Sequence, residues 1–141
     1  GDPETQPIML RLQSDLVALC LKACDGELEG TEIDFDSRAA VGVVLAAGGY
    51  PADYAKGDVI SGLDEAAKLD GKVFHAGTAL KDGAVVTSGG RVLCATALGN
   101  SVTEAQQQAY QLVKAIDWKD VYFRNDIAYR AMAREQAGPA K

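Results

Sequence analysis

The sequence has little histidine and cysteine, no cluster of positive charge and no long apolar run. One histidine, His75, and three cysteines without a close pair disfavour a zinc site of ordinary spacing. A net charge of −6 without a lysine or arginine cluster disfavours a nucleic-acid surface. No apolar run approaches the roughly 18 residues of a membrane span, and the polar start of the chain is not a signal peptide. We therefore expect a cytoplasmic protein that binds neither nucleic acid nor a membrane.

What is present is an ordinary globular composition, with 48% apolar and 24% charged residues. At 141 residues, the chain suits one domain, or a small domain plus a segment of another. Cys20 and Cys24 lie four residues apart in a segment of helical periodicity, and Cys94 lies within an apolar run. These positions predict reduced core thiols rather than disulfides.

The strongest strand signal spans residues 84–99, AVVTSGGRVLCATALG. Ser88-Gly89-Gly90 interrupts two apolar runs, which indicates either a hairpin or a sharply bent strand. Gly89 and Gly90 allow positive φ or close approach of a ligand to the backbone, and Arg91 places a cationic fork beside them. A plain turn with a solvated arginine explains the same residues, so the pattern alone leaves both interpretations open.

The remaining middle of the chain predicts further short strands and turns. The expected strands are 38–47, 59–60 and 72–80, with a turn at 48–51 and helical turns at 63–69. This pattern is typical of a small antiparallel sheet or a flattened barrel. His75 lies in the third strand without a nucleophile motif, which favours a hydrogen-bonded structural role.

Both ends of the chain are predicted to be mostly helical. Residues 1–7 indicate a loop, in which Asp2 and Glu4 either orient an amine or form a solvated acidic turn. A helix capped by Ser14 or Gln13 follows, ending at Gly26 with an apolar face at 16, 19, 20 and 23. The S-x-x-E box at Ser101 starts another helix, and Asn125 or Asp126 caps a last one over 127–136. The fold class is therefore α+β.

Five short motifs occur in a fixed order along the chain. They are GDPETQP at 1–7, AAGGYP at 46–51, VFHAGT at 73–78, TSGGRVL at 87–93 and FRNDIAYRA at 123–131. Each motif is weak alone, but together they resemble the carboxyl-terminal part of the phosphoribosylamine–glycine ligases, also called glycinamide ribonucleotide synthetases. The resemblance covers essentially residues 1–136.

The resemblance implies an ATP-grasp enzyme of de novo purine biosynthesis. In that family, ATP phosphorylates glycine, and the amine of 5-phosphoribosylamine attacks the glycyl phosphate to give glycinamide ribonucleotide, ADP and phosphate. Residues 1–36 would end the ATP-grasp domain, and residues 37–141 would form a carboxyl-terminal domain of the rudimentary sandwich-hybrid type. The remaining ligase domains, glycine and 5-phosphoribosylamine are the implied partners.

The resemblance also implies which parts of the site this chain supplies. ATP and Mg²⁺ (or Mn²⁺) would bind in the complete enzyme, with the metal on a Glu-x-Asn pair upstream of Gly1, so the chain alone is expected to be inactive. Substrate contacts would come from Asp2, Glu4, Gly89, Gly90 and Arg91. Arg130 belongs to a D-I-x-x-R-A motif in which Ala128 replaces the usual glycine, and its role stays open between packing and contact.

Two alternatives to a ligase fragment remain from the residues. One is a carrier domain of the biotinyl or lipoyl kind, which would carry a lysine at an exposed hairpin tip. The expected tip, 88–90, has no lysine. The other is a free-standing ligand-binding or interaction module without catalysis.

Overall fold

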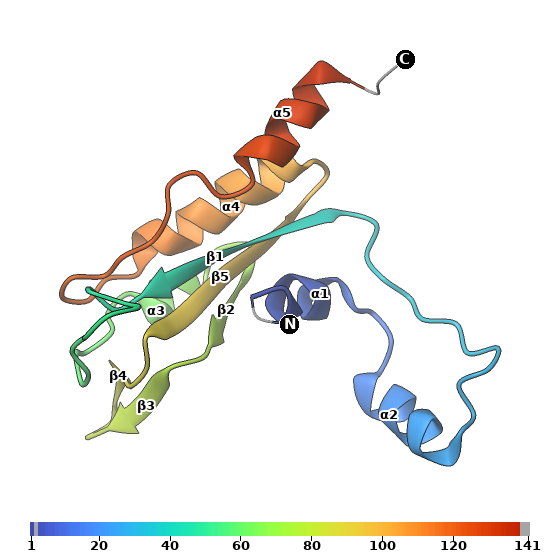
Figure 1. Ribbon diagram of the computed structural model, residues 1–141, viewed down its shortest axis with the longest axis horizontal. Helices are drawn as coiled ribbons and strands as arrows, with labels where there is room; N and C mark the ends of the chain where they lie inside the picture. Colours follow the sequence, from blue (N-terminus) through green and yellow to red (C-terminus); the bar gives the residue numbers. More distant parts are fainter. Residues whose placement is uncertain (2, 139–141) are drawn as a thin grey trace.

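The computed structural model describes residues 1 and 3–138 and confirms an α+β fold (Figure 1). The helices are α1 (Thr5–Arg11), α2 (Leu16–Asp25), α3 (Leu63–Ala66), α4 (Val102–Ala115) and α5 (Tyr129–Ala137). The strands are β1 (Ala39–Ala46), β2 (Lys72–His75), β3 (Thr78–Lys81), β4 (Ala84–Thr87) and β5 (Arg91–Gly99). In this described part of the chain, the strands form two small antiparallel sheets rather than the flattened barrel.

The larger sheet has the order β1-β5-β2, with β5 at its centre. Side chains alternate between the two faces of a strand. One face, which includes Val43 and Ala95, joins the core with Leu112 of α4. On the other face, Gly42 lies against Pro7 of α1, where an added Cβ would stand 3.1 Å from the proline Cγ. The sheet therefore lies between α4 and α1.

The predicted hairpin between β4 and β5 is wrong, and the two runs are separate strands of different sheets rather than one bent strand. β4 pairs with β3 in the two-stranded sheet, whereas β5 pairs with β1 and β2. The predicted strand 72–80 is also divided, because the chain leaves the first sheet after His75 and enters the second at Thr78. The exposed hairpin tip is the turn of Asp82 (φ 50°) and Gly83 (φ 80°). Since Lys81 flanks this tip, the absence of lysine at 88–90 does not argue against a carrier.

The amino-terminal segment is more helical than predicted. α1 begins at Thr5 and includes Pro7. The proline is tolerated because it falls in the first turn of the helix, where a missing N–H costs nothing. Asp15 caps α2 through the N–H groups of Val17 and Ala18, in place of Ser14 or Gln13. The predicted end of α2 at Gly26 is confirmed by its φ of 74°.

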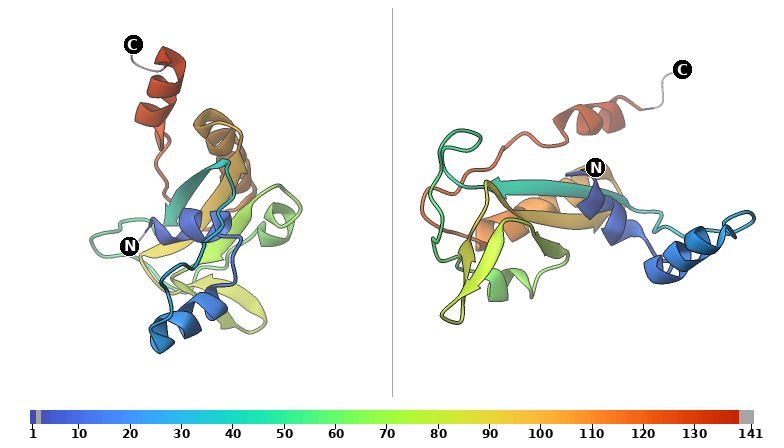
Figure 2. Two further views of the ribbon diagram at one scale, coloured as in Figure 1. Left: turned by 90° about the vertical axis from the view of Figure 1, so that its right-hand side faces the viewer. Right: turned by 60° about the horizontal axis from the view of Figure 1, so that its bottom comes forward.

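The apolar residues of α2 are not buried within this chain. Leu16 is 47% exposed, Val17 67% and Leu21 60%, and α2 lies apart from both sheets in Figure 1 and in the right-hand view of Figure 2. Cys20 and Cys24 are exposed as well, so the prediction of core thiols is wrong for them and confirmed only for Cys94.

The amino terminus of α4 is capped from two directions. The Ser101 side chain accepts a hydrogen bond from the Glu104 N–H at 3.0 Å, which confirms Ser101 as the cap, while the Glu104 carboxylate accepts from the Asn100 N–H. Glu135 of α5 accepts from the N–H groups of Val102 and Thr103. The Ala105 N–H reaches the Ser101 carbonyl, so each N–H of the first turn has an acceptor. The bond from Val102 is the main cause that lowers the pKa of Glu135 below its ordinary value.

We expect Glu135→Gln to weaken the docking of α5 on α4 and to remove its pH dependence. A carboxyl whose pKa is lowered on folding stabilises the folded state above its ordinary pKa, and the stabilisation is lost as the pH falls through the lowered pKa. After correction for the intrinsic pH dependence of exchange, the Val102 and Thr103 amides should therefore lose protection at acidic pH in the wild type. In Glu135→Gln their protection should not depend on pH. Glu32→Gln, another exposed site, is the control. Equal pH profiles for wild type and Glu135→Gln would contradict the carboxylate cap.

α5 begins two residues later than predicted, and neither Asn125 nor Asp126 caps it. The Asp126 carboxylate pairs with Arg124, 2.7 Å from its Nη2. The residue before the helix is Ala128, whose φ of 68° lies in the left-handed region. Glycine adopts this conformation without the Cβ penalty, which explains physically why a glycine suits this position.

Ala128→Gly is therefore expected to stabilise α5 locally by about 0.5–1 kcal/mol. The measurement is hydrogen exchange of the α5 amides at neutral pH, which should slow by roughly two- to five-fold. Ala133→Gly, within the exposed part of the same helix, should accelerate exchange because glycine is a poor helix former. Faster exchange in both variants would refute strain at Ala128.

Candidate substrate-binding loop

The candidate site is the loop 88–91, which carries the chain from the small sheet into the central strand β5. Its backbone is held by Gly77, whose carbonyl accepts from the N–H groups of Ser88 at 2.8 Å and Gly89 at 3.1 Å. The Gly77 N–H donates to the Arg91 carbonyl at 2.9 Å. The loop is thus fixed to the segment between β2 and β3.

The two loop glycines are required by close packing and not by positive φ. A Cβ on Gly89 would lie 2.9 Å from the Gly77 Cα. A Cβ on Gly90 would lie 2.1 Å from the Tyr50 Cδ2 and 3.1 Å from the Tyr54 Cε1. The Tyr50 and Tyr54 rings meet edge to face, with centroids 6.0 Å apart. This pair of rings covers the buried Gly90.

Arg91 lies at the rim of this arrangement. It opens β5 and pairs with Ala46, next to a register shift in β1. Arg91 is exposed, whereas Val92 after it is fully buried. A cationic fork at the start of a strand is suited to binding a phosphate or a carboxylate.

Of the two acidic candidates, the structure describes only Glu4. Asp2 lies outside the described residues. Glu4 is exposed at the start of α1 and makes no side-chain bond to the helix. The substrate roles of all five residues stay predictions.

Gly77, Tyr50 and Tyr54 are parts of the loop environment that the sequence did not identify. Tyr50 directly follows the glycine pair in the AAGGYP motif, and Gly77 lies in VFHAGT. Their position within motifs was the available signal, but their contacts with 88–91 arise only when separate segments meet. The His75 Nδ1 lies 3.0 Å from the Thr78 Oγ1, which agrees with the hydrogen-bonded interpretation.

Among residues 1 and 3–138, no group of three or more histidine, cysteine or acidic side chains could hold a metal ion. No helix in the same range is long and apolar enough to cross a membrane.

Comparisons with known proteins identify the domain. A family profile described as "Phosphoribosylglycinamide synthetase, C domain" matches residues 40–130. The phosphoribosylamine–glycine ligase of Pseudomonas aeruginosa is 68% identical over 136 residues, which are 96% of this chain and 32% of that protein. The ligase of Escherichia coli O6:H1 is 62% identical over 137 residues, with the same shares of each chain. The chain thus spans about a third of the length of these curated relatives.

A solved structure gives the same answer for the fold. The crystal structure of phosphoribosylamine–glycine ligase from Thermotoga maritima matches with a TM-score of 0.77 and 36% identity, over 89% of this chain and 30% of that one. These matches define the chain as a domain of a ligase. It belongs to the family of phosphoribosylglycinamide synthetase C domains, the carboxyl-terminal part of phosphoribosylamine–glycine ligases. The resemblance inferred from the five motifs is confirmed.

Proposed function

We propose that this chain is part of an ATP-dependent ligase that joins glycine to 5-phosphoribosylamine. Glycine is first converted to a glycyl phosphate, and the amine then displaces phosphate to give glycinamide ribonucleotide, a step of purine biosynthesis in the cytoplasm. The observation that carries this proposal is the similarity to phosphoribosylamine–glycine ligases over 96% of the chain. Their name contains both substrates.

Within that reaction, the chain contributes a substrate-facing wall and not the metal site. ATP and Mg²⁺ (or Mn²⁺) would supply and activate the transferred phosphoryl group, and we expect their ligands in the rest of the ligase. Gly89 and Gly90 shape the loop, while Arg91 orients a negatively charged substrate group. Asp2 and Glu4 are proposed to orient the amine.

We further propose that residues 1–36 complete the ATP-grasp domain and that 37–141 form the carboxyl-terminal domain. Support comes from α2, whose exposed Leu16, Val17 and Leu21 have no partner surface among the described residues. A helix of 10 residues is marginal in water unless its apolar side is packed. The rest of the ligase chain is the partner expected to cover it.

A chimaeric ligase tests the proposal. The corresponding carboxyl-terminal part of the Escherichia coli O6:H1 relative is replaced by this chain, and glycinamide ribonucleotide formation is measured with ATP, glycine and 5-phosphoribosylamine. We expect product from the chimaera and no ATP turnover from the isolated chain. A folded chimaera that binds ATP and glycine but forms no product would contradict the ligase assignment and favour a binding module.

A further inference from the structure

A second basic surface lies at the start of α5, away from the candidate loop. It is a depression of about 480 Å³ whose walls include Arg124, Arg130 and Arg134 together with Asp126 and Tyr129. Three guanidinium groups and one carboxylate gather there in a chain whose net charge is −6. The local charge is therefore opposite to that of the whole protein.

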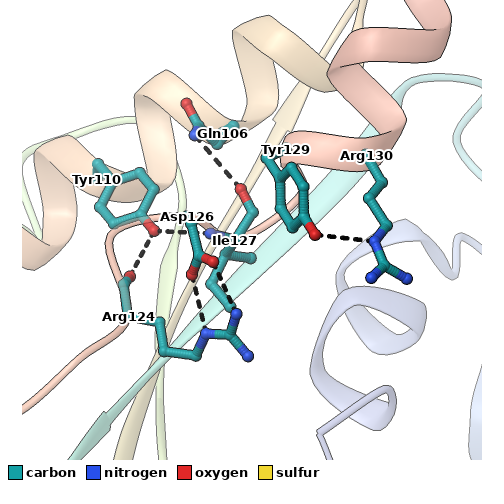
Figure 3. A network of polar contacts seen from close by, with 7 residues as sticks. All are labelled: Gln106, Tyr110, Arg124, Asp126, Ile127, Tyr129 and Arg130. Atoms are coloured by element: carbon teal, nitrogen blue, oxygen red, sulfur yellow. Dashed lines mark hydrogen bonds and ion pairs between the residues drawn. The ribbon is translucent and has the colours of Figure 1, made fainter.

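The chain segment 124–127, which leads into this depression, is held in place by side chains of α4 (Figure 3). The Tyr110 hydroxyl donates to the Arg124 carbonyl and accepts from the Ile127 N–H at 3.2 Å. The Gln106 amide donates to the Ile127 carbonyl at 3.3 Å. These bonds fix the backbone between Arg124 and Ile127 before the helix begins.

One of the arginines is neutralised, and it forms a wall of the depression. The Nε and Nη2 of Arg124 donate to the two carboxylate oxygens of Asp126, at 2.8 and 2.7 Å. Such a two-bond pair is among the stronger charged contacts. It also lowers the pKa of Asp126, so the pair persists at neutral pH.

The other two arginines differ from Arg124 in their contacts. The Nε of Arg130 donates to the Tyr129 Oη at 2.9 Å, and its Cζ lies over the Tyr129 ring, 5.5 Å from the centroid, so the tyrosine orients the guanidinium (Figure 3). Neither Arg130 nor Arg134 forms an ion pair with any residue that the structure describes. Glu135 cannot neutralise them, because its carboxylate caps α4.

Arg130 and Arg134 are four residues apart on α5, so they share one face of the helix. Like charges at this spacing repel and weaken a helix, and an anion between them would relieve the repulsion. Guanidinium forks bind phosphate through paired hydrogen bonds. We propose that Arg130 and Arg134 bind a phosphate monoester, with the Arg124–Asp126 pair as a fixed wall of the site. This inference does not depend on the ligase reaction.

The test is titration of the 141-residue chain with ribose 5-phosphate, inorganic phosphate, ribose and acetate, followed by amide NMR of α5. We expect saturable shifts with ribose 5-phosphate and none with ribose or acetate. Equal binding of inorganic phosphate would show that the phosphate group alone is recognised. Weaker binding of inorganic phosphate would show that the sugar contributes. Both outcomes support the site, whereas no binding of either phosphate, or equal binding of acetate, overturns it.

Variants then locate the site. Arg130→Gln with Arg134→Gln should weaken binding at least about tenfold, and Lys119→Ala, which removes an exposed charge elsewhere, should not. Tyr129→Phe removes the acceptor that orients Arg130 and should weaken binding less. Circular dichroism checks that helix content is kept. Binding that survives the double variant but is lost in Arg91→Ala would overturn the proposal and assign the phosphate to the candidate loop.

Discussion

Replacing Gly62 by alanine is expected to destabilise the protein by about 3 kcal/mol or more. Gly62 precedes α3 with a φ of 80°, and an added Cβ would lie 1.7 Å from the Ala115 carbonyl oxygen at the end of α4. The backbone must separate there, which breaks the two backbone hydrogen bonds between Ser61 and Asp117 and the one from the Ser61 hydroxyl. The buried Ile60 and Ala66 on either side would lose their packing. Urea unfolding followed by fluorescence of Trp118, which lies in the same core, gives the measurement.

Gly83→Ala is the matched control for this prediction. Gly83 also has a φ of 80°, but an added Cβ would have no atom within 4 Å. It should therefore cost only the conformational penalty of about 1–2 kcal/mol. Equal losses in the two variants would show that backbone conformation alone matters, and that the contact with Ala115 does not.

The second large effect is expected for Arg91→Ala in the chimaeric ligase. If Arg91 contacts a charged group of 5-phosphoribosylamine, its loss should lower kcat/KM for that substrate by roughly ten- to a hundredfold. The KM for ATP should change little, because the nucleotide is expected to bind elsewhere. Steady-state kinetics with each substrate varied in turn separates the two effects.

Two further variants control the Arg91 experiment. Lys81→Ala removes an exposed charge from the neighbouring hairpin and should leave the kinetics unchanged. Arg91→Lys keeps the charge without the planar fork and should recover part of the loss. Unchanged kinetics for 5-phosphoribosylamine in Arg91→Ala would remove Arg91 from the site.

The elements that the sequence predicted well are those whose signals are local. β1 and α4 follow from an apolar strand and from a capping box at Ser101, each contained within its own element. The division of 72–80 was missed because it depends on Gly77 packing against Gly89, a contact between separate segments. α1 was missed because Pro7 resembles a helix breaker, although the first turn tolerates it.

The candidate site shows the same limit. Gly89, Gly90 and Arg91 were predicted as site residues because they are adjacent in sequence, and the structure adds a packing reason for each glycine. Tyr50 and Tyr54 were not found, since only the folded chain brings them onto Gly90. The family assignment came from the order of five motifs, which is information beyond the local physics of any one of them.

The central position of β5 has a consequence for synthesis of the chain. β1 and β2 do not pair with each other, and both depend on a strand that the ribosome makes later. Until β5 emerges, the apolar run of β1 has unpaired edges on both sides, which favours pairing with other chains. Any product that terminates before Gly99 would keep this exposed strand. Truncated forms should therefore aggregate and need chaperones, while chains extended through α4 close the sheet.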